Sequence, residues 1–265
     1  MKNIKNIKWF CFVTAIFLFP KETSAQGPPI FTDTPIMLGL EGRGVRTFGR
    51  YISRENIKVY VQPVAIPYNI NAKWQVGAIL PYRSLNPESD GAKTNSGFGD
   101  LTVFTKYQLF QNDSKGETFR GLIKLSETFP TGNDSESPPI GSGVNTTSIG
   151  LVTGYITIKY GLYAEFGYNI VSDGSPNSLN YNFAFSYPLL PQKYPPFQLN
   201  ISADVNGNVV PETDQNVLFL SPGLQLITGK RFLLETGVQF PIAQSGYDNN
   251  KFIYTYTLGV RILIF

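Results

Sequence analysis

The sequence predicts an all-β protein, a closed antiparallel transmembrane β-barrel of about twelve strands. Segments of about 10–14 residues with a two-residue alternation of apolar and polar side chains recur along the chain. After the first 25 residues no apolar stretch approaches the roughly 20 residues that a membrane-spanning helix needs. Connections between the segments alternate between short and long, as they do in outer-membrane barrels. Ten or fourteen strands fit the same pattern.

The first 25 residues have the features of a secretory signal peptide. Three lysines precede an apolar run over residues 9–19, and residues 23–25 read Thr-Ser-Ala. A basic start, a short apolar run and small residues before the cleavage point define such a peptide. We expect cleavage after Ala25, export from the cytoplasm, an N-terminal lead segment over residues 26–42 and a barrel over residues 43–265.

The composition that remains without the signal peptide excludes several classes of function. Residues 1–25 hold four of the 22 basic and one of the 19 acidic residues, which leaves 18 of each and a formal net charge of zero. A neutral chain gives no reason to expect nucleic acid as a partner. The single cysteine, Cys11, is also removed, so disulfides and thiolate metal sites are excluded from the remainder.

The alternation of apolar and polar residues places the strands. Between residues 197 and 206 every second residue is apolar and the residues between are polar, and residues 251–264 repeat this pattern. Successive side chains of a strand point to opposite faces, so each segment has one apolar and one polar face. In order, we expect strands near residues 43–53, 56–68, 72–84, 98–110, 118–129, 146–159, 161–172, 179–189, 197–207, 216–228, 230–242 and 251–264.

The connections divide into two sets that belong to opposite ends of a barrel. Tight turns are expected near residues 69–71, 160–161 and 228–230, and longer polar loops near residues 85–97, 130–145, 207–215 and 243–250. Two connections on the short-turn side, at 111–117 and 189–196, are predicted to be longer than the others there. The Pro- and Gly-rich loop 130–145 is a candidate constriction that folds over the mouth of the barrel.

The apolar face favours a barrel in lipid over a soluble β-sandwich. It is rich in Tyr, Phe and Trp near the segment ends, where interfacial aromatic girdles lie. The segments also reach the 9–11 residues needed to cross a bilayer at a tilt, whereas strands of globular proteins are usually nearer 5–6 residues. We therefore expect outer-membrane lipids around the barrel. The apolar last strand and terminal Phe265 resemble the C-terminal signal of outer-membrane proteins, which implies the barrel-assembly machinery as a partner.

Four strings along the chain resemble one protein family. They read GPPIFTDTP at residues 27–35, AILPY at 78–82, GFGDLTVFTKYQLF at 97–110 and FPTGN at 129–133. They stand in the order expected of the MetA-pathway of phenol degradation family of outer-membrane, transporter-like proteins. The resemblance covers the N-terminal half, and the C-terminal half shares the strand rhythm. It implies a barrel in the bacterial outer membrane that moves small solutes, aromatic compounds among them.

The sequence lacks the residues that most barrel enzymes use. It contains no histidine, which removes the usual general base beside a nucleophile and the commonest nitrogen ligand of metals. We therefore expect no enzymatic activity, no cofactor and no metal site. An enzyme that uses a pair of carboxylates on the polar face is the remaining catalytic alternative.

The charged residues of the polar face are the candidate lining of a lumen. The proposed set is Lys73, Arg83, Asp100, Lys106, Glu165, Asp204, Arg231, Glu235 and Arg261, and Lys58, Arg120 and Lys124 fall on the same face in our register. Basic residues outnumber the acidic ones there. One interpretation is a preference for anionic solutes, by the logic of charged rings in pores. The other is that these charges form ion pairs that stabilise the wall.

The sequence is compatible with two functions. The first is an outer-membrane channel for passive passage of small solutes, with aromatic or anionic ones among them. The second is a structural or adhesion-type barrel with a plugged lumen that acts through its surface loops. Conductance of the folded protein in a bilayer separates the two.

Overall fold

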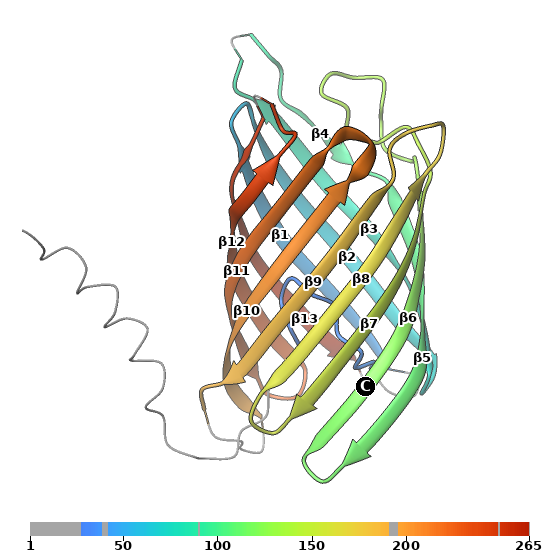
Figure 1. The fold of residues 1–265 in the computed structure, drawn as a ribbon, viewed down its shortest axis with the longest axis vertical. Coiled ribbons are helices and arrows are strands. Elements are labelled where there is room, and N and C mark those ends of the chain that lie inside the picture. Colours follow the sequence, from blue (N-terminus) through green and yellow to red (C-terminus); the bar gives the residue numbers. More distant parts are fainter. Residues whose placement is uncertain (1–27, 39–41, 90, 191–195, 249, 265) are drawn as a thin grey trace, which may run out of the picture.

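The computed structural model describes residues 28–38, 42–89, 91–190, 196–248 and 250–264 and shows a closed antiparallel barrel (Figure 1). Twelve long strands form the wall. They are β1 (Arg43–Arg54), β2 (Ile57–Asn71), β3 (Trp74–Pro87), β5 (Leu101–Ser114), β6 (Glu117–Phe129), β7 (Thr146–Thr157), β8 (Gly161–Val171), β9 (Ser178–Pro188), β10 (Phe197–Val210), β11 (Gln215–Thr228), β12 (Phe232–Ser245) and β13 (Phe252–Ile264).

The first and last strands close the sheet. β1 pairs with β13 from Arg43 opposite Ile264 to Arg54 opposite Phe252, while its other edge pairs with β2. The further pairs of the wall join long strands that follow one another along the chain, including β3 with β5. A closed sheet gives each backbone N–H and C=O of the wall a partner, which a strand edge in hydrocarbon would lack. The predicted twelve-stranded closed barrel is confirmed.

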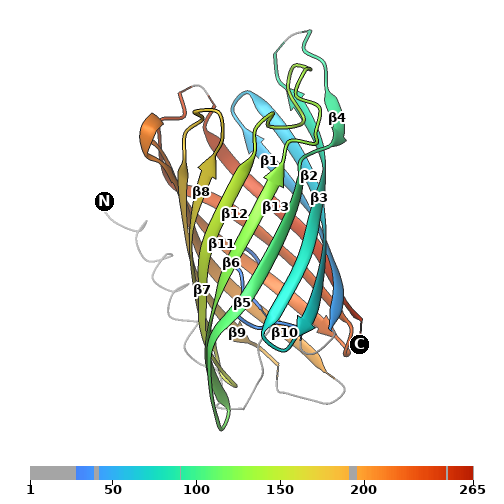
Figure 2. The same ribbon diagram turned by 90° about the vertical axis from the view of Figure 1, so that its right-hand side faces the viewer.

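The two ends of the barrel differ in the length of their connections (Figure 2). The lower end carries tight turns, and the β5–β6 connection there is shorter than expected. Both strands extend through the predicted loop 111–117, and only Lys115 and Gly116 turn the chain. Gly116 has φ +79°, a conformation that glycine adopts without strain. The predicted loop 207–215 is likewise shorter, because β10 continues to Val210 and a single 3₁₀ turn, η2 (Pro211–Thr213), leads into β11.

A short strand that the alternation did not predict lies at the upper end. β4 (Asn95–Phe98) pairs with β3 between Tyr82 and Leu85, beyond the point where the β3–β5 ladder stops at Ile79 and Thr102. The segment is only four residues long and contains Gly97, so it is too brief to show a period. It carries the wall above the general level of the rim (Figure 2).

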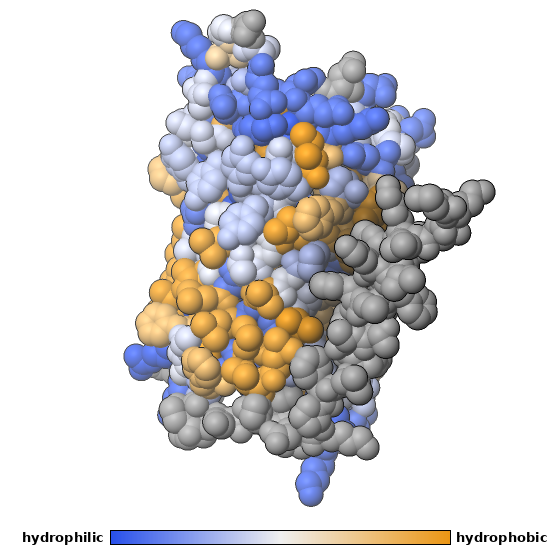
Figure 3. All heavy atoms as spheres, turned by 90° about the vertical axis from the view of Figure 1, so that its left-hand side faces the viewer, coloured by the Kyte–Doolittle hydropathy of each residue, from blue (hydrophilic) through white to orange (hydrophobic). Residues whose placement is uncertain are grey.

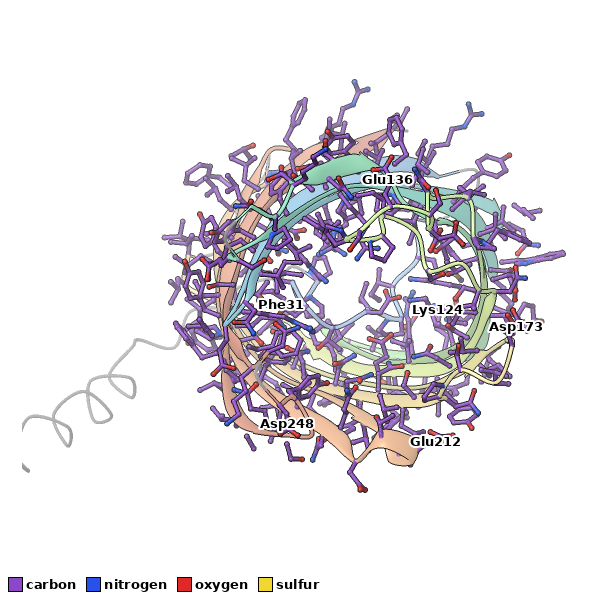
Figure 4. The ribbon with its side chains drawn as sticks, turned by 90° about the horizontal axis from the view of Figure 1, so that it is seen from above. Phe31, Lys124, Glu136, Asp173, Glu212 and Asp248 are labelled. Carbon is purple, nitrogen blue, oxygen red and sulfur yellow. The ribbon has the colours of Figure 1, made fainter. Side chains whose placement is uncertain are left out.

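The loop over residues 130–145 is bound to the wall at the upper mouth. Asp100 accepts hydrogen bonds from the backbone N–H of Gly132 (2.9 Å) and of Ser142 (2.7 Å). Arg83 donates to the carbonyl of Ile140 (2.6 Å), whose side chain is buried. The loop that carries Glu136 thus lies against the inner side of the wall, where it reaches over the mouth (Figure 4). This is the placement that a constriction requires.

The two faces of the wall follow the predicted alternation. Leu162, Phe166 and Ile170 of β8 are each more than 40% exposed on the outside. On the inside, Gln198, Asn200 and other polar residues of β10 are buried. Apolar side chains gather over the lower part of the face seen in Figure 3, and hydrophilic ones cover its upper end. This distribution is that of a barrel with a lipid-facing band below longer polar loops.

The described residues contain no helix that is long and apolar enough to cross a membrane. The signal peptide expected over residues 1–25 and the terminal Phe265 lie outside the described residues.

Candidate functional site

Residues 28–38, called the lumen segment below, precede β1 and lie inside the barrel (Figure 1). Ile30 and Thr32 are 2% and 3% exposed, although they belong to no strand. Figure 4 shows Phe31 and Lys124 within the ring of strands. Fixing a chain segment costs about 1–2 kcal/mol of backbone entropy per residue, so specific contacts with the wall must hold this one in place.

The prolines at the start of the lumen segment explain part of this binding. Pro28 and Pro29 have no N–H, so only their carbonyls need partners. The carbonyl of Pro28 accepts a hydrogen bond from the side chain of Gln225 (2.9 Å), and that of Pro29 accepts one from Arg261 (2.8 Å). The carbonyl of Ile30 accepts a third from Arg46 (2.9 Å). Three consecutive carbonyls are therefore bound by side chains of β11, β13 and β1.

A buried carboxylate of β10 binds the next two residues. Asp204 is 0% exposed, and its Oδ2 accepts the N–H of Phe31 (3.2 Å) and of Thr32 (2.9 Å). A carboxylate buried inside a protein needs such donors, because leaving water without them is costly. Asp204 thus holds the backbone of the lumen segment through one carboxyl oxygen.

Asp33 provides the one carboxylate that the lumen segment contributes. Lys106 of β5 contacts both of its oxygens (2.7 and 2.6 Å), and Lys124 of β6 contacts Oδ2 (3.1 Å). The N–H of Asp33 donates to Glu165 of β8 (3.1 Å), which itself lies 3.8 Å from Lys124. Two lysines of the wall therefore share the carboxylate of Asp33, and Lys124 also pairs with Glu165 of the wall.

Glu235 of β12 organises the two arginines that bind the segment. Its side chain is 0% exposed and pairs with Arg46 (2.8 Å) and Arg261 (2.7 Å). Each guanidinium donates to Glu235 and to a carbonyl of the lumen segment at the same time. The planar fork of arginine suits such shared contacts.

Two cavities adjoin the lumen segment. One, of about 380 Å³, lies between the segment and the wall and is lined by Arg46, Phe48, Arg50, Phe104 and Lys106 among others. The second, of about 370 Å³, is more apolar and is lined by residues that include Met37, Tyr163 and Leu233. Both share the residues Thr34, Ile36 and Leu38 as lining, so the segment forms the partition between them.

The nine predicted lining residues fall into three groups. Those that surround the lumen segment are Lys106, Glu165, Asp204, Glu235 and Arg261. Arg83 and Asp100 bind the loop 130–145 at the upper mouth. Lys73 and Arg231 are exposed in the turns after β2 and β11, away from the segment. Three more basic residues were expected on the polar face. Lys124 lies in the first group, Arg120 pairs with Asp113 (3.1 Å), and Lys58 pairs with Glu88 (3.1 Å).

Sequence reasoning missed Asp33, Arg46 and Arg50. Asp33 lies in a segment with no alternation, so no register assigned it to a face. A usable signal was present nonetheless. The basic residues of the polar face outnumber its acids, and residues 28–38 contain a single acid, Asp33, between two threonines. Arg46 and Arg50 lie four residues apart on β1. Because side chains alternate between the faces of a strand, both lie on the same face as Phe48.

Comparison with solved structures shows the same fold in proteins of low sequence identity. The COG4313 outer membrane channel from Pseudomonas putida F1 is 12% identical, with a TM-score of 0.71 over 89% of this chain and 100% of that one. A KdgM porin in complex with disordered oligogalacturonate is 9% identical, with a TM-score of 0.53 over 83% and 100%. The β domain of the Bordetella autotransporter BrkA is 13% identical, with a TM-score of 0.51 over 83% and 98%.

Sequence comparison adds a family. The model described as "Putative MetA-pathway of phenol degradation" matches residues 53–255, which is most of the wall. No curated protein matches the chain.

Proposed function

Since the chain belongs to the MetA-pathway of phenol degradation family, whose model covers residues 53–255, we propose that it is a channel for small solutes in the bacterial outer membrane. The observation that carries this proposal is the lumen, which is lined by charged side chains and keeps a cavity on each side of the lumen segment. A wall that served only to fill its interior would pack that space with side chains.

The width of the barrel supports a narrow path. Barrels of eight strands are filled by their own side chains, and those of sixteen hold an open aqueous channel. Twelve strands give an intermediate lumen, and the lumen segment narrows it further. We therefore expect small solutes to pass beside the segment, or when it moves, and larger ones to be excluded.

The charges of the lumen favour anions among these solutes. Five basic side chains line the larger cavity, Arg46, Arg50, Lys106, Lys124 and Arg261, against two acidic ones, Asp33 and Glu165. Ion pairs within the lumen neutralise part of this excess, as one interpretation of the sequence held. The remainder gives the path a positive potential.

A plugged barrel that acts through its loops is the second candidate. The hydrogen bonds that hold the lumen segment favour it, because they engage consecutive residues from Pro28 to Asp33. In that case the upper loops, including 130–145, are the working surface.

Planar-bilayer recording tests the first proposal against the second. The protein is expressed from the full-length sequence and purified from outer membranes, and its folding is checked by heat-modifiable gel mobility. We expect steady conductance with a reversal potential that indicates anion preference. Folded protein that leaves the bilayer as insulating as a bare one would contradict the channel and support the plugged barrel.

A further inference from the structure

One arginine of the larger cavity, Arg50, forms no ion pair with another described residue. Arg50 lines this cavity, and among the described residues no carboxylate oxygen lies within 4 Å of its guanidinium. Its Nε is buried without a hydrogen-bond partner in the same part of the chain. By contrast, the neighbouring Arg46 is paired with Glu235. A buried donor of a charged group that has no partner is costly, and a bound anion would remove that cost.

An aromatic ring holds Arg50 in position. The guanidinium carbon of Arg50 lies 4.8 Å from the ring centroid of Phe48, and that of Arg46 lies 4.6 Å from the same centroid. All three residues lie two apart on β1 and face the lumen. Two guanidinium groups beside one ring concentrate positive charge at this point of the cavity, and cation–π attraction partly offsets their repulsion.

One part of the cavity wall is apolar. Ala65 and Pro67 of β2, Ile79 of β3 and Phe104 of β5 line it, together with Ile36 of the lumen segment. A volume of about 380 Å³ falls within the range of small-molecule sites, which are mostly apolar with a few placed polar groups. The site therefore combines an arginine that has no ion pair among the described residues with an apolar part of the wall that can cover an apolar body.

We propose that this cavity is a binding site for small carboxylates with an apolar, ring-sized body, and that Arg50 binds their carboxylate. The bidentate fork of arginine fits a carboxylate, while Phe104, Ile79 and Pro67 cover the apolar part. The inference rests on the proposed function only in that solutes must reach the lumen. It adds a class of solute and the residue that selects it.

Fluorine NMR of 4-fluorobenzoate added to the detergent-solubilised protein tests the site without requiring conductance. We expect saturable binding, at least tenfold weaker in Arg50→Gln, which corresponds to about 1.4 kcal/mol. Arg50→Lys keeps the charge and should lie between the two. Arg231→Gln removes an arginine that is exposed in a turn outside the cavity and should bind as the parent does.

Two further probes separate the charge from the apolar body. 4-Fluorobenzyl alcohol has the same ring without the charge and should bind at least tenfold more weakly than 4-fluorobenzoate, whereas Phe104→Ala should weaken binding of the benzoate. Equal binding of the alcohol and the benzoate, or unchanged binding in Arg50→Gln with folding verified by gel mobility, would overturn the inference. Binding without conductance would support the carboxylate site and refute the channel. Conductance without binding would support the channel and refute the carboxylate site.

Discussion

Replacing Asp33 by Asn should loosen the lumen segment, because this carboxylate carries its only ion pairs with the wall. The substitution keeps the shape of the side chain and removes the charge that Lys106 and Lys124 contact at 2.6 and 3.1 Å. The amide still accepts a hydrogen bond, and Lys124 keeps Glu165 at 3.8 Å. The segment keeps its contacts with Asp204 and with the arginines.

The structure sets the size of the effect. A hydrogen bond to a charged group contributes roughly 1.5–3 kcal/mol, and the side chains of Lys106 and Lys124 are 13% and 29% exposed, so the lower end of that range applies. Two such contacts amount to about 3 kcal/mol. At about 1.4 kcal/mol for each factor of ten, the undocked population should rise about 100-fold.

A cysteine at position 32 measures that population. Thr32 is 3% exposed, and Cys11 is the only natural cysteine, so Thr32→Cys combined with Cys11→Ser gives one thiol that is protected while the segment is docked. Adding Asp33→Asn should accelerate maleimide labelling about 100-fold. Asp113→Asn breaks a pair with Arg120 at the barrel end and serves as the control, with no acceleration. An unchanged rate in Asp33→Asn, or an equal increase in the control, would refute the reasoning.

Three other substitutions test separate parts of the structure. Glu235→Ala leaves two guanidinium groups without their shared counter-charge and should lower the free energy of unfolding in urea by about 3–5 kcal/mol. Glu88→Ala, which removes a side chain that is 45% exposed, should lower it by less than about 1 kcal/mol. Equal losses would contradict the role of burial. Asp100→Asn removes the charge that binds two N–H groups of the loop 130–145, so proteolysis within that loop should become faster while the wall stays resistant. Gly207→Val would place its Cβ in the ring of Tyr181, which covers this glycine, and should destabilise the barrel by about 1–3 kcal/mol, as judged by the temperature of the gel-mobility shift. Gly97→Ala should be tolerated, because the added Cβ would meet only one atom, of Ile140, within 4 Å.

The strands of the wall could be predicted from the sequence because the alternation that marks them lies within each short segment. A two-residue period places each residue of a strand on one face, so the polar face that the sequence predicts for β10 can be read from neighbouring residues alone; its members Gln198 and Asp204 are buried. The errors fall where the period ends. Near the rim both faces meet water, so the alternation fades at Ser114 and Glu117 although the ladder continues to these residues.

The site could be predicted only in part, since it depends on a segment that has no period. Lys106, Glu165 and Glu235 were expected on the inner face, but their partner Asp33 lies 73 and 132 residues away from the first two along the chain. Only the closed barrel brings these residues together. Arg50 was missed for a different reason, because β1 mixes Arg, Thr and Gly in a way that gives neither face a clear apolar character.

The distances along the chain between the lumen segment and its partners also fix an order of assembly. Pro29 is bound by Arg261, 232 residues later, and Thr32 by Asp204, 172 residues later. These groups are not in place until β10 to β13 have joined the sheet and β13 has met β1. The lumen segment precedes every strand of the wall along the chain, yet its binding partners are assembled only when the barrel closes, so its docking depends on a complete barrel.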